Sequence, residues 1–300
     1  IQHHLGHAYN ARISGDMGSN KEEAIRYFTR SLEVFTREAY PDGWAMTQLL
    51  VGTAYDARIL GDAAFNKEEA ISHFEQALEL YERKDDRINC ARARMHLGDA
   101  YRTRINGDRV TNKQKSIRFS MLALQVYSRD EYPEEWAQLQ LNLGNAYRTP
   151  ASDTPEDAFF DHTASIRCFV LALQVYTRVA YPELWALTQS NLGIAYMRHT
   201  EGNLTTNLED SIRCLKQALH VYALRTKRAA TWSCTVVYTA IVTQNSQSQS
   251  LTGVLTGSYI RYIKLCMAAV ASRYKRETFP DDWARTMSNV GNAYLLQRMI

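Results

Sequence analysis

The histidines near the start of the chain are the residues best suited to metal chemistry. In the stretch HHLGH, His3 and His7 are four residues apart, so on a helix they would lie on one face, and imidazole nitrogens are common zinc ligands. A zinc site needs a further ligand, and no third candidate lies near these two in the sequence. We therefore interpret the pair as part of a solvated helix face and expect no metal site.

Other side chains that could act as nucleophiles or bases are scattered. His96 and His220 each stand alone on an expected helix, and Cys168 and Cys214 occupy equivalent places in two later helices, as core packing would produce. The sequence contains no phosphate-binding glycine loop, no zinc-protease helix signature and no nucleophile elbow. We expect no catalytic residue, no cofactor and no enzyme activity in these residues.

Composition limits the partners and the location. The 300 residues carry a net charge of +3, with 45% hydrophobic and 22% charged residues, an ordinary soluble composition that gives no reason to expect a nucleic-acid partner. No apolar run approaches the roughly 18 residues needed to cross a bilayer, so no membrane span is expected. The five cysteines are widely spaced and form no Cys-x-x-Cys pair. They indicate free thiols in a reducing, intracellular compartment, either the cytoplasm or an organelle interior.

Internal periodicity organises the sequence. A Leu-Gly or Val-Gly pair recurs, and the first three intervals between its glycines are each 46 residues and the fourth 49. These glycines are Gly6, Gly52, Gly98, Gly144, Gly193 and Gly291. All five tryptophans stand eight residues before this glycine position, which places them at one point of the repeat.

Each repeat is predicted to hold two helices. In the first, Trp44, Val51 and Tyr55 are spaced so that they share one helical face. This helix is expected to end at a C-capping glycine, the candidates being Gly15, Gly61, Gly107 and Gly202. The second helix is predicted to begin at an Asn or Asp N-cap, the candidates being Asn20, Asn66, Asn112, Asp161 and Asn207.

The recurring stretch Tyr-Pro-x-x-Trp-Ala separates one repeat from the next. Its proline would stop the second helix, and the acidic residues after it would favour the start of the following first helix. We interpret the stretch as a structural joint rather than as a recognition motif for a partner. The joint residues are Trp44, Trp136, Trp185, Trp232, Trp283, Pro41, Pro133, Pro182 and Pro280.

These patterns predict an all-α chain with about thirteen helices in about six repeat units, forming a single domain over residues 1–300. The units are expected at 1–41, 42–87, 88–133, 134–182, 183–228 and 229–280, with 244–258 as a degenerate polar loop. Because the sequence starts inside one first-type helix and stops inside another, we expect it to be a slice of a longer polypeptide.

The repeat resembles the tetratricopeptide repeat (TPR) family, in an enlarged form of about 46 residues. The resemblance rests on Leu-Gly-x-x-Tyr in the first helix and Ala-x-x-x-Phe-x-x-Ala in the second, and it covers roughly residues 1–228 and 276–300. The matching residues are Val51, Gly52, Tyr55, Ala70, Phe74 and Ala77, and again Leu5, Gly6, Tyr9, Ala24, Phe28 and Ser31. The resemblance implies a right-handed α-solenoid of antiparallel helix pairs whose first helices line a concave face that binds peptides or helices of other proteins.

Family geometry would place the variable residues that follow each glycine on that concave face. The candidate partner-binding residues are Asp99, Arg102, Asn145, Arg148, Arg198 and Asn292, with Arg12, Arg58 and Arg104 as a ladder one turn further along. Guanidinium groups bind carboxylates bidentately, so the partner could be an acidic peptide. The alternative is that these arginines are solubilising charges paired with carboxylates of neighbouring repeats. Family members that clamp a terminal carboxylate carry lysine where this chain has Leu141 and Ser288, which argues against that particular clamp.

The leading functional hypothesis is therefore a protein–protein interaction scaffold. The enlarged repeat also resembles arrays in multidomain regulatory proteins, some of which carry a caspase-like protease domain, so a regulatory or sensor array of a larger protein is an alternative. A structural subunit of a large assembly is a third hypothesis.

Overall fold

A computed structural model describes residues 1–12, 14–149, 161–199 and 201–224, and within these ranges it contains ten α-helices and no strand. The all-α prediction is confirmed for this part of the chain. The expected unit 229–280 and the polar loop 244–258 lie outside the described residues, as do Trp232, Trp283, Pro280 and Asn292. The further helices of the thirteen expected would fall there too.

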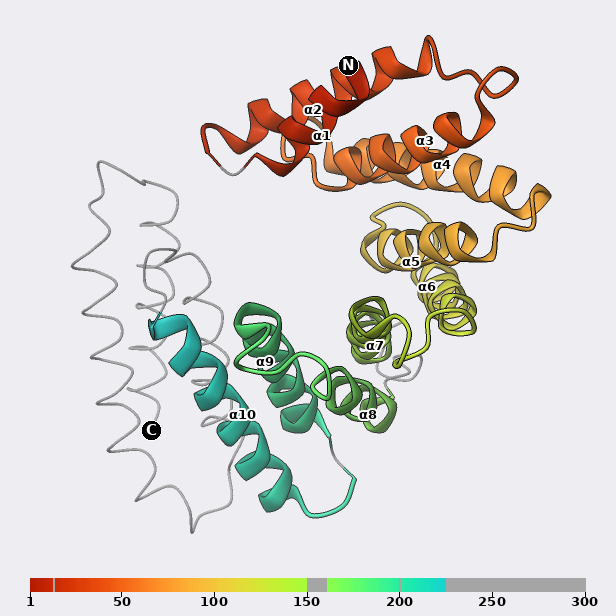
Figure 1. Ribbon diagram of the computed structural model, residues 1–300. Helices are drawn as coiled ribbons and strands as arrows, with labels where there is room; N and C mark the ends of the chain where they lie inside the picture. Colours follow the sequence, from red (N-terminus) through yellow and green to blue (C-terminus); the bar gives the residue numbers. More distant parts are fainter. Residues whose placement is uncertain (13, 150–160, 200, 225–300) are drawn as a thin grey trace. The chain divides into compact units, whose positions relative to one another are not determined.

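The helices follow one another as five pairs, each made of a first and a second helix (Figure 1). The pairs are α1 (Gln2–Ala11) with α2 (Met17–Leu32), α3 (Pro41–Asp56) with α4 (Ala63–Arg83), α5 (Arg87–Thr103) with α6 (Arg109–Leu124), α7 (Pro133–Arg148) with α8 (His162–Ala172), and α9 (Pro182–Arg198) with α10 (Leu204–Leu224). The chain divides into two compact units between Cys168 and Phe169. Each helix from α1 to α6 packs against the next, α9 packs against α10, and the first helices α3, α5 and α7 also touch in sequence order. This is the packing of a helical repeat.

Proline begins three of the first helices. Pro41, Pro133 and Pro182 are the first residues of α3, α7 and α9, where the missing N–H costs no hydrogen bond. Acidic side chains follow in the first turn of each of these helices, where the helix dipole favours negative charge. In α5, Arg87 stands at the proline position and the N-cap is Asp86, whose carboxylate accepts a hydrogen bond from the Asn89 N–H at 3.0 Å.

The proline does not end the preceding helix, which corrects the sequence interpretation. The second helices α2, α6 and α8 end nine or ten residues before it, at Leu32, Leu124 and Ala172. A hydroxyl then organises a turn in each case: Thr36 accepts a hydrogen bond from the Ala39 N–H, Ser128 from the Glu131 N–H, and Thr177 from the Ala180 N–H. In α4, Glu82 stands at this position and the helix continues to Arg83.

The second helices begin one turn earlier than predicted. The N-caps of α2, α4 and α6 are Asp16, Asp62 and Asp108, each accepting a hydrogen bond at 2.7–2.8 Å from the N–H three residues later, and Asn203 does the same for α10 at 3.2 Å. Of the expected caps, Asp161 alone acts in this way among the described residues, accepting from the Ala164 N–H at 2.7 Å.

The asparagines taken as caps instead hold the loop between the paired helices. Each of the four is buried within the first turns of its second helix and donates its Nδ2–H to a loop carbonyl six residues earlier. The pairs are Asn20 with Ser14 O (3.0 Å), Asn66 with Leu60 O (2.8 Å), Asn112 with Asn106 O (2.8 Å) and Asn207 with Glu201 O (2.9 Å). A buried amide with a fixed partner orders that loop, because leaving the group unpaired would cost about 1–3 kcal/mol.

The glycines expected as C-caps also lie elsewhere. The C-caps of α1, α3, α5 and α9 are Arg12, Ala57, Arg104 and His199. Gly15, Gly61, Gly107 and Gly202 come later, directly before the N-cap of the second helix, with φ between +77° and +83°. Glycine is required there because other residues are strained at positive φ.

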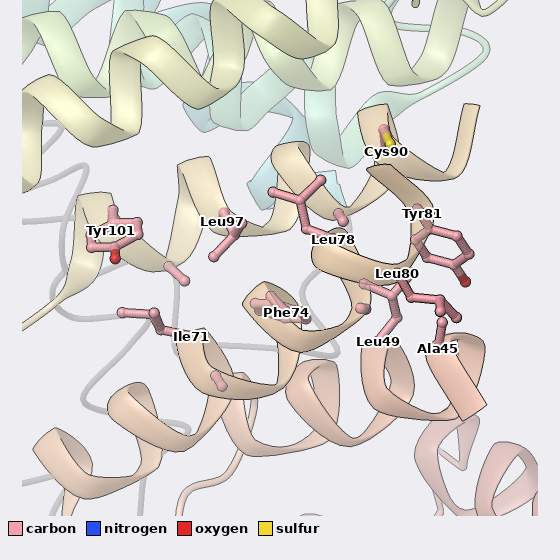
Figure 2. Packing of buried hydrophobic residues seen from close by; sticks show 14 residues of the cluster. Ala45, Leu49, Ile71, Phe74, Leu78, Leu80, Tyr81, Cys90, Leu97 and Tyr101 are labelled. Atoms are coloured by element: carbon pink, nitrogen blue, oxygen red, sulfur yellow. The ribbon is translucent and has the colours of Figure 1, made fainter. Parts of the chain in front are cut away.

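The core of the first unit forms where a second helix lies between two first helices. Figure 2 shows Leu49 of α3, Phe74 and Tyr81 of α4, and Leu97 of α5 in one buried cluster. The glycine of the Leu-Gly pair lets the paired helices approach closely, because a Cβ on Gly52 would lie 2.6 Å from the buried Phe74 ring.

Candidate functional site

A cleft of about 260 Å³ lies where the C-terminal ends of α5 and α7 meet the start of α6. Four cationic side chains line it, and one of them, Arg102, is among the predicted partner-binding residues. The lining consists of Tyr101, Arg102, Thr103 and Arg104 at the end of α5, Arg109, Asn112 and Lys113 on α6, and Ala146 and Thr149 at the end of α7. This cleft is our candidate site.

Arg102 and Arg104 are held in place by carboxylates on one side of the cleft. The Arg102 Nη2 lies 2.6 Å from the Asp99 Oδ1 one turn earlier on α5. Arg104 binds Glu68 of α4 with both arms of its guanidinium, at 2.8 and 2.7 Å, which lowers the pKa of the Glu68 carboxyl and raises that of Arg104. The two guanidinium groups are therefore preorganised at the cleft wall.

A second pair of the same kind shows that the Arg104–Glu68 contact is a repeating element. Arg58, at the end of α3, binds Glu22 of α2 with distances of 2.6 and 2.9 Å. We call Arg58–Glu22 and Arg104–Glu68 the strut pairs, because each joins the end of a first helix to the second helix of the preceding pair. Their sequence separation is 36 residues in both cases.

The next junction, between α6 and α7, has no strut pair, because the sequence places Gln114 and Pro150 at the two positions. There the Lys113 Nζ donates to the Thr149 carbonyl at 2.7 Å and to the Tyr147 carbonyl at 3.4 Å. Burial lowers the pKa of the Lys113 ammonium, an effect that the Asp161 carboxylate opposes. Lys113, which has counterparts in Lys21 and Lys67, thus remains at this junction without a strut pair.

The charge of α6 differs from that of the other second helices. The stretch NKEEA, which appears in both α2 and α4, becomes NKQKS in α6. As a result, α6 contains no Asp or Glu from Arg109 to Leu124, while its basic residues are Arg109, Lys113, Lys115 and Arg118. The signal for Arg109 and Lys113 in the sequence is this change of charge between equivalent second helices.

Tyr101 closes the apolar side of the cleft. Its ring stacks on Phe119 with centroids 5.8 Å apart, and the Lys115 Nζ lies 4.7 Å from the ring centre. Its hydroxyl donates to the Glu75 carboxylate at 2.8 Å. Burial, with the hydrogen bond to Glu75, raises the pKa of Tyr101 to about 12, so the hydroxyl remains a donor at neutral pH.

The other predicted partner-binding residues are distributed over both units. On α7, the Arg148 Nη2 is 3.4 Å from the Asn145 Oδ1, a contact equivalent to Arg102–Asp99 on α5. Arg198 is the last residue of α9, in the second unit, and Asn292 lies outside the described residues. In the first unit, Arg58 and Arg104 bind carboxylates of neighbouring helices. For these two residues of the ladder, this agrees with the alternative interpretation, in which the arginines pair with carboxylates of neighbouring repeats.

The histidine pair sits at the start of the first unit. The rings of His3 and His7 are 4.8 Å apart between centroids, and His3 Nδ1 is 3.4 Å from the Thr47 Oγ1. Burial and the two neighbouring histidines lower the pKa of His3. Within the described ranges, no three His, Cys, Asp or Glu side chains gather as metal ligands would.

Three cysteines fall in the described part of the chain, and all three are free and buried. Burial raises the pKa of Cys168 and of Cys214 to about 11, so both thiols are protonated at neutral pH. Each lies near the tyrosine of its own helix pair, Tyr147 or Tyr196, at the position that Phe119 fills against Tyr101. Across residues 1–224, apart from the undescribed gaps, none of the helices combines the length and the apolar character needed to cross a membrane.

The joint tryptophans Trp44, Trp136 and Trp185 are half-buried, and an arginine lies over the ring of Trp44 and of Trp185. Arg37 lies 5.2 Å from the centre of Trp44 and reaches Glu79 of α4 at 3.0 Å. Trp44 packs on the cluster shown in Figure 2, whereas Val51 packs against α2, so the two do not share one contact surface.

In the second unit, Arg178 lies 5.8 Å from the centre of Trp185 and 2.8 Å from the His220 Nδ1. Trp185 packs against Ala218 and Val221 of α10. The sequence analysis did not identify this arginine as a structural residue of the joint. The signal was present, because an arginine stands three residues before the aromatic residue of every Tyr-Pro or Phe-Pro in the sequence.

No family model and no curated protein matches this chain.

Proposed function

We propose that this chain is a TPR-like scaffold that binds a peptide segment of another protein. The observation that carries the proposal is the contrast between constant joints and variable helix ends. The asparagine–loop bond, the glycine crossing and the aspartate cap recur from pair to pair, while the position after the glycine reads His7, Thr53, Asp99, Asn145 and Ile194.

Recurrent contacts account for the stability of a repeat array, since each repeat needs only its neighbours. Residues that vary at equivalent positions are then available for recognition. In the first unit, two arginines at such positions each donate a hydrogen bond to the side chain three residues earlier on the same helix. Arg102 donates to Asp99, and Arg148 donates to Asn145. Such orientation reduces the entropy lost when a guanidinium binds a partner.

The experiment is selection from a displayed peptide library on the purified full chain, followed by fluorescence anisotropy with the selected peptides. We expect saturable binding that weakens by about tenfold when Arg102→Gln and Arg148→Gln are combined, as the loss of a charged hydrogen bond predicts. The matched control combines Arg26→Gln and Arg30→Gln, which removes two charges from the exposed face of α2. Failure to select any peptide, or equal affinity for both double variants, would overturn the proposal.

A further inference from the structure

We propose that a second copy of this chain docks on an exposed apolar edge of the first unit, so that the protein forms a twofold-symmetric dimer. The edge lies where the chain passes from each first helix to its second helix. We call it the loop edge, and its residues are Met17, Ile59, Leu60, Phe65, Ile105 and Val110. The inference goes beyond the scaffold function and does not depend on it.

The loop edge gathers large apolar side chains that the fold leaves in solvent. Ile59 and Ile105, in two successive loops, are 65% and 60% exposed, and Phe65, the third residue of α4, is 53% exposed. Single exposed apolar residues are common on protein surfaces and need no explanation. Several of them on one edge indicate a contact surface.

The structure of the loop does not itself require apolar residues. In the equivalent loop between α9 and α10, the sequence places Thr200 and Glu201 where the second loop of the first unit has Ile59 and Leu60. The buried asparagine still donates to the loop carbonyl there, at 2.9 Å, and the glycine before the N-cap keeps its positive φ. The same loop therefore forms with polar side chains, and the apolar ones in the first unit need another reason.

Consecutive loops are held close together, so their apolar side chains form one row. A Cβ on Gly18, the second residue of α2, would lie 3.3 Å from the Leu60 Cδ1, so the loop after α3 packs on the start of α2. One helix pair later, the strut pair Arg104–Glu68 holds the loop that carries Ile105 near the start of α4. The row therefore runs along the starts of α2, α4 and α6.

The charged groups among these apolar side chains have partners within their own chain. The arginines of the loops, Arg58 and Arg104, are bound by the glutamates of the two strut pairs. Asp62, beside the central loop, accepts a hydrogen bond from the Phe65 N–H at 2.7 Å. Since polar groups are costly to bury chiefly when they lose their partners, docking on the loop edge leaves these three satisfied.

The area of the loop edge favours a second copy as its occupant. A fully exposed large apolar residue presents about 200 Å², so the exposed parts of the six residues amount to about 600 Å² on one copy. A twofold contact uses the same patch on both copies and would bury about 1,200 Å², the lower limit for a stable protein interface. The loop edge thus supplies both halves of an interface by itself.

Sedimentation velocity of the full chain, from nanomolar to high micromolar concentration, tests the proposal. We expect the wild type to approach the mass of a dimer as the concentration rises. Ile59→Ser combined with Phe65→Ser should weaken association by at least about a hundredfold, because each copy loses two apolar anchors. Both side chains are more than half exposed within one chain, so the dilute variant should keep the melting temperature of the dilute wild type.

The matched control combines Val34→Ser with Ile88→Ser, which removes two exposed apolar side chains from the opposite ends of the helices. It should leave the dissociation constant of the dimer within about twofold. A wild type that remains monomeric at the highest concentration, or a dimer that is equally stable in both double variants, would overturn the proposal. Either result would leave the scaffold function untouched, because that function is tested by the affinity of selected peptides.

Discussion

The glycine of the Leu-Gly pair shows how far one residue can be interpreted from sequence. Its recurrence in phase with the tryptophans located the five helix pairs of the described residues. The partner across the crossing could not be predicted in the same way: it is Phe28 or Phe74 in the first two pairs, but Ser120 and Leu215 later. At the helix crossing the glycine stays the same from pair to pair, whereas the type of the residue that faces it changes.

Gly52→Ala provides a test at this scale. Helix propensity alone predicts a gain of about 1 kcal/mol, whereas the new Cβ would lie 2.6 Å from Phe74 and 3.1 Å from the Ala70 carbonyl. Overpacking of this kind costs about 1–3 kcal/mol, so we expect a lower melting temperature. The neighbouring change Thr53→Ala is the control and should have a small effect. A melting temperature raised by Gly52→Ala would show that the crossing is not tight.

The buried asparagines show where residue-level interpretation failed. Asn20, Asn66 and Asn112 recur three or four residues before an acidic or polar position and so resemble N-caps. The aspartates that actually cap the helices lie four residues earlier, next to the glycines at positive φ. The N-cap position and the buried asparagine position both favour short polar side chains. Residue type alone therefore could not tell which of the two positions is the N-cap.

At the scale of helices, each strut pair joins two consecutive helices through residues that are far apart in the sequence. The sequence contained both partners at fixed spacing, but a separation of 36 residues is not a local pattern and could not be recognised without the packing of α4 on α5. The starts of α3, α7 and α9 were predictable, because proline acts on its own backbone. Local rules thus gave the starts of these three first helices, whereas the strut pairs became evident only from the packing of the helices.

The strut pair predicts a pH dependence that Glu68→Gln should remove. Arg104 lowers the pKa of Glu68 below its ordinary value of 4.5, so the pair contributes its full stability above that pH and loses it as the pH falls through the lowered pKa. Because the two side chains are 32% and 24% exposed, we expect the contribution to be about 1 kcal/mol or less at neutral pH.

Melting temperatures of wild type and Glu68→Gln between pH 7 and 3 test this sign. The difference should be largest near neutral pH and should shrink in acid. Glu38→Gln, in the exposed turn between α2 and α3, is the matched control for removing one carboxylate. A difference that grew as the pH fell would contradict the assigned role of Arg104.

At the scale of the whole chain, the repeat period and the pairing of helices followed from the sequence, while the lengths of the second helices did not. After three of these helices comes a turn that Thr36, Ser128 or Thr177 stabilises. This turn lies before the proline that was predicted to stop the helix. Within the first unit each pair nevertheless packs against the next, as in a quasi-one-dimensional array.

That architecture predicts that damage to one pair stays local. Gly193→Ala would place a Cβ 2.8 Å from Leu215 Cγ and 3.1 Å from the Ser211 carbonyl, which loosens the packing of α9 on α10. Hydrogen exchange should therefore become faster in α9 and α10, while α1 to α4 keep the protection seen in the wild type. Gly52→Ala is the reciprocal control and should affect α3 and α4 instead. Equal loss of protection along α1 to α10 after Gly193→Ala would mean that the chain unfolds as one cooperative body, because a nearest-neighbour array transmits a local defect only as far as its interfaces remain coupled.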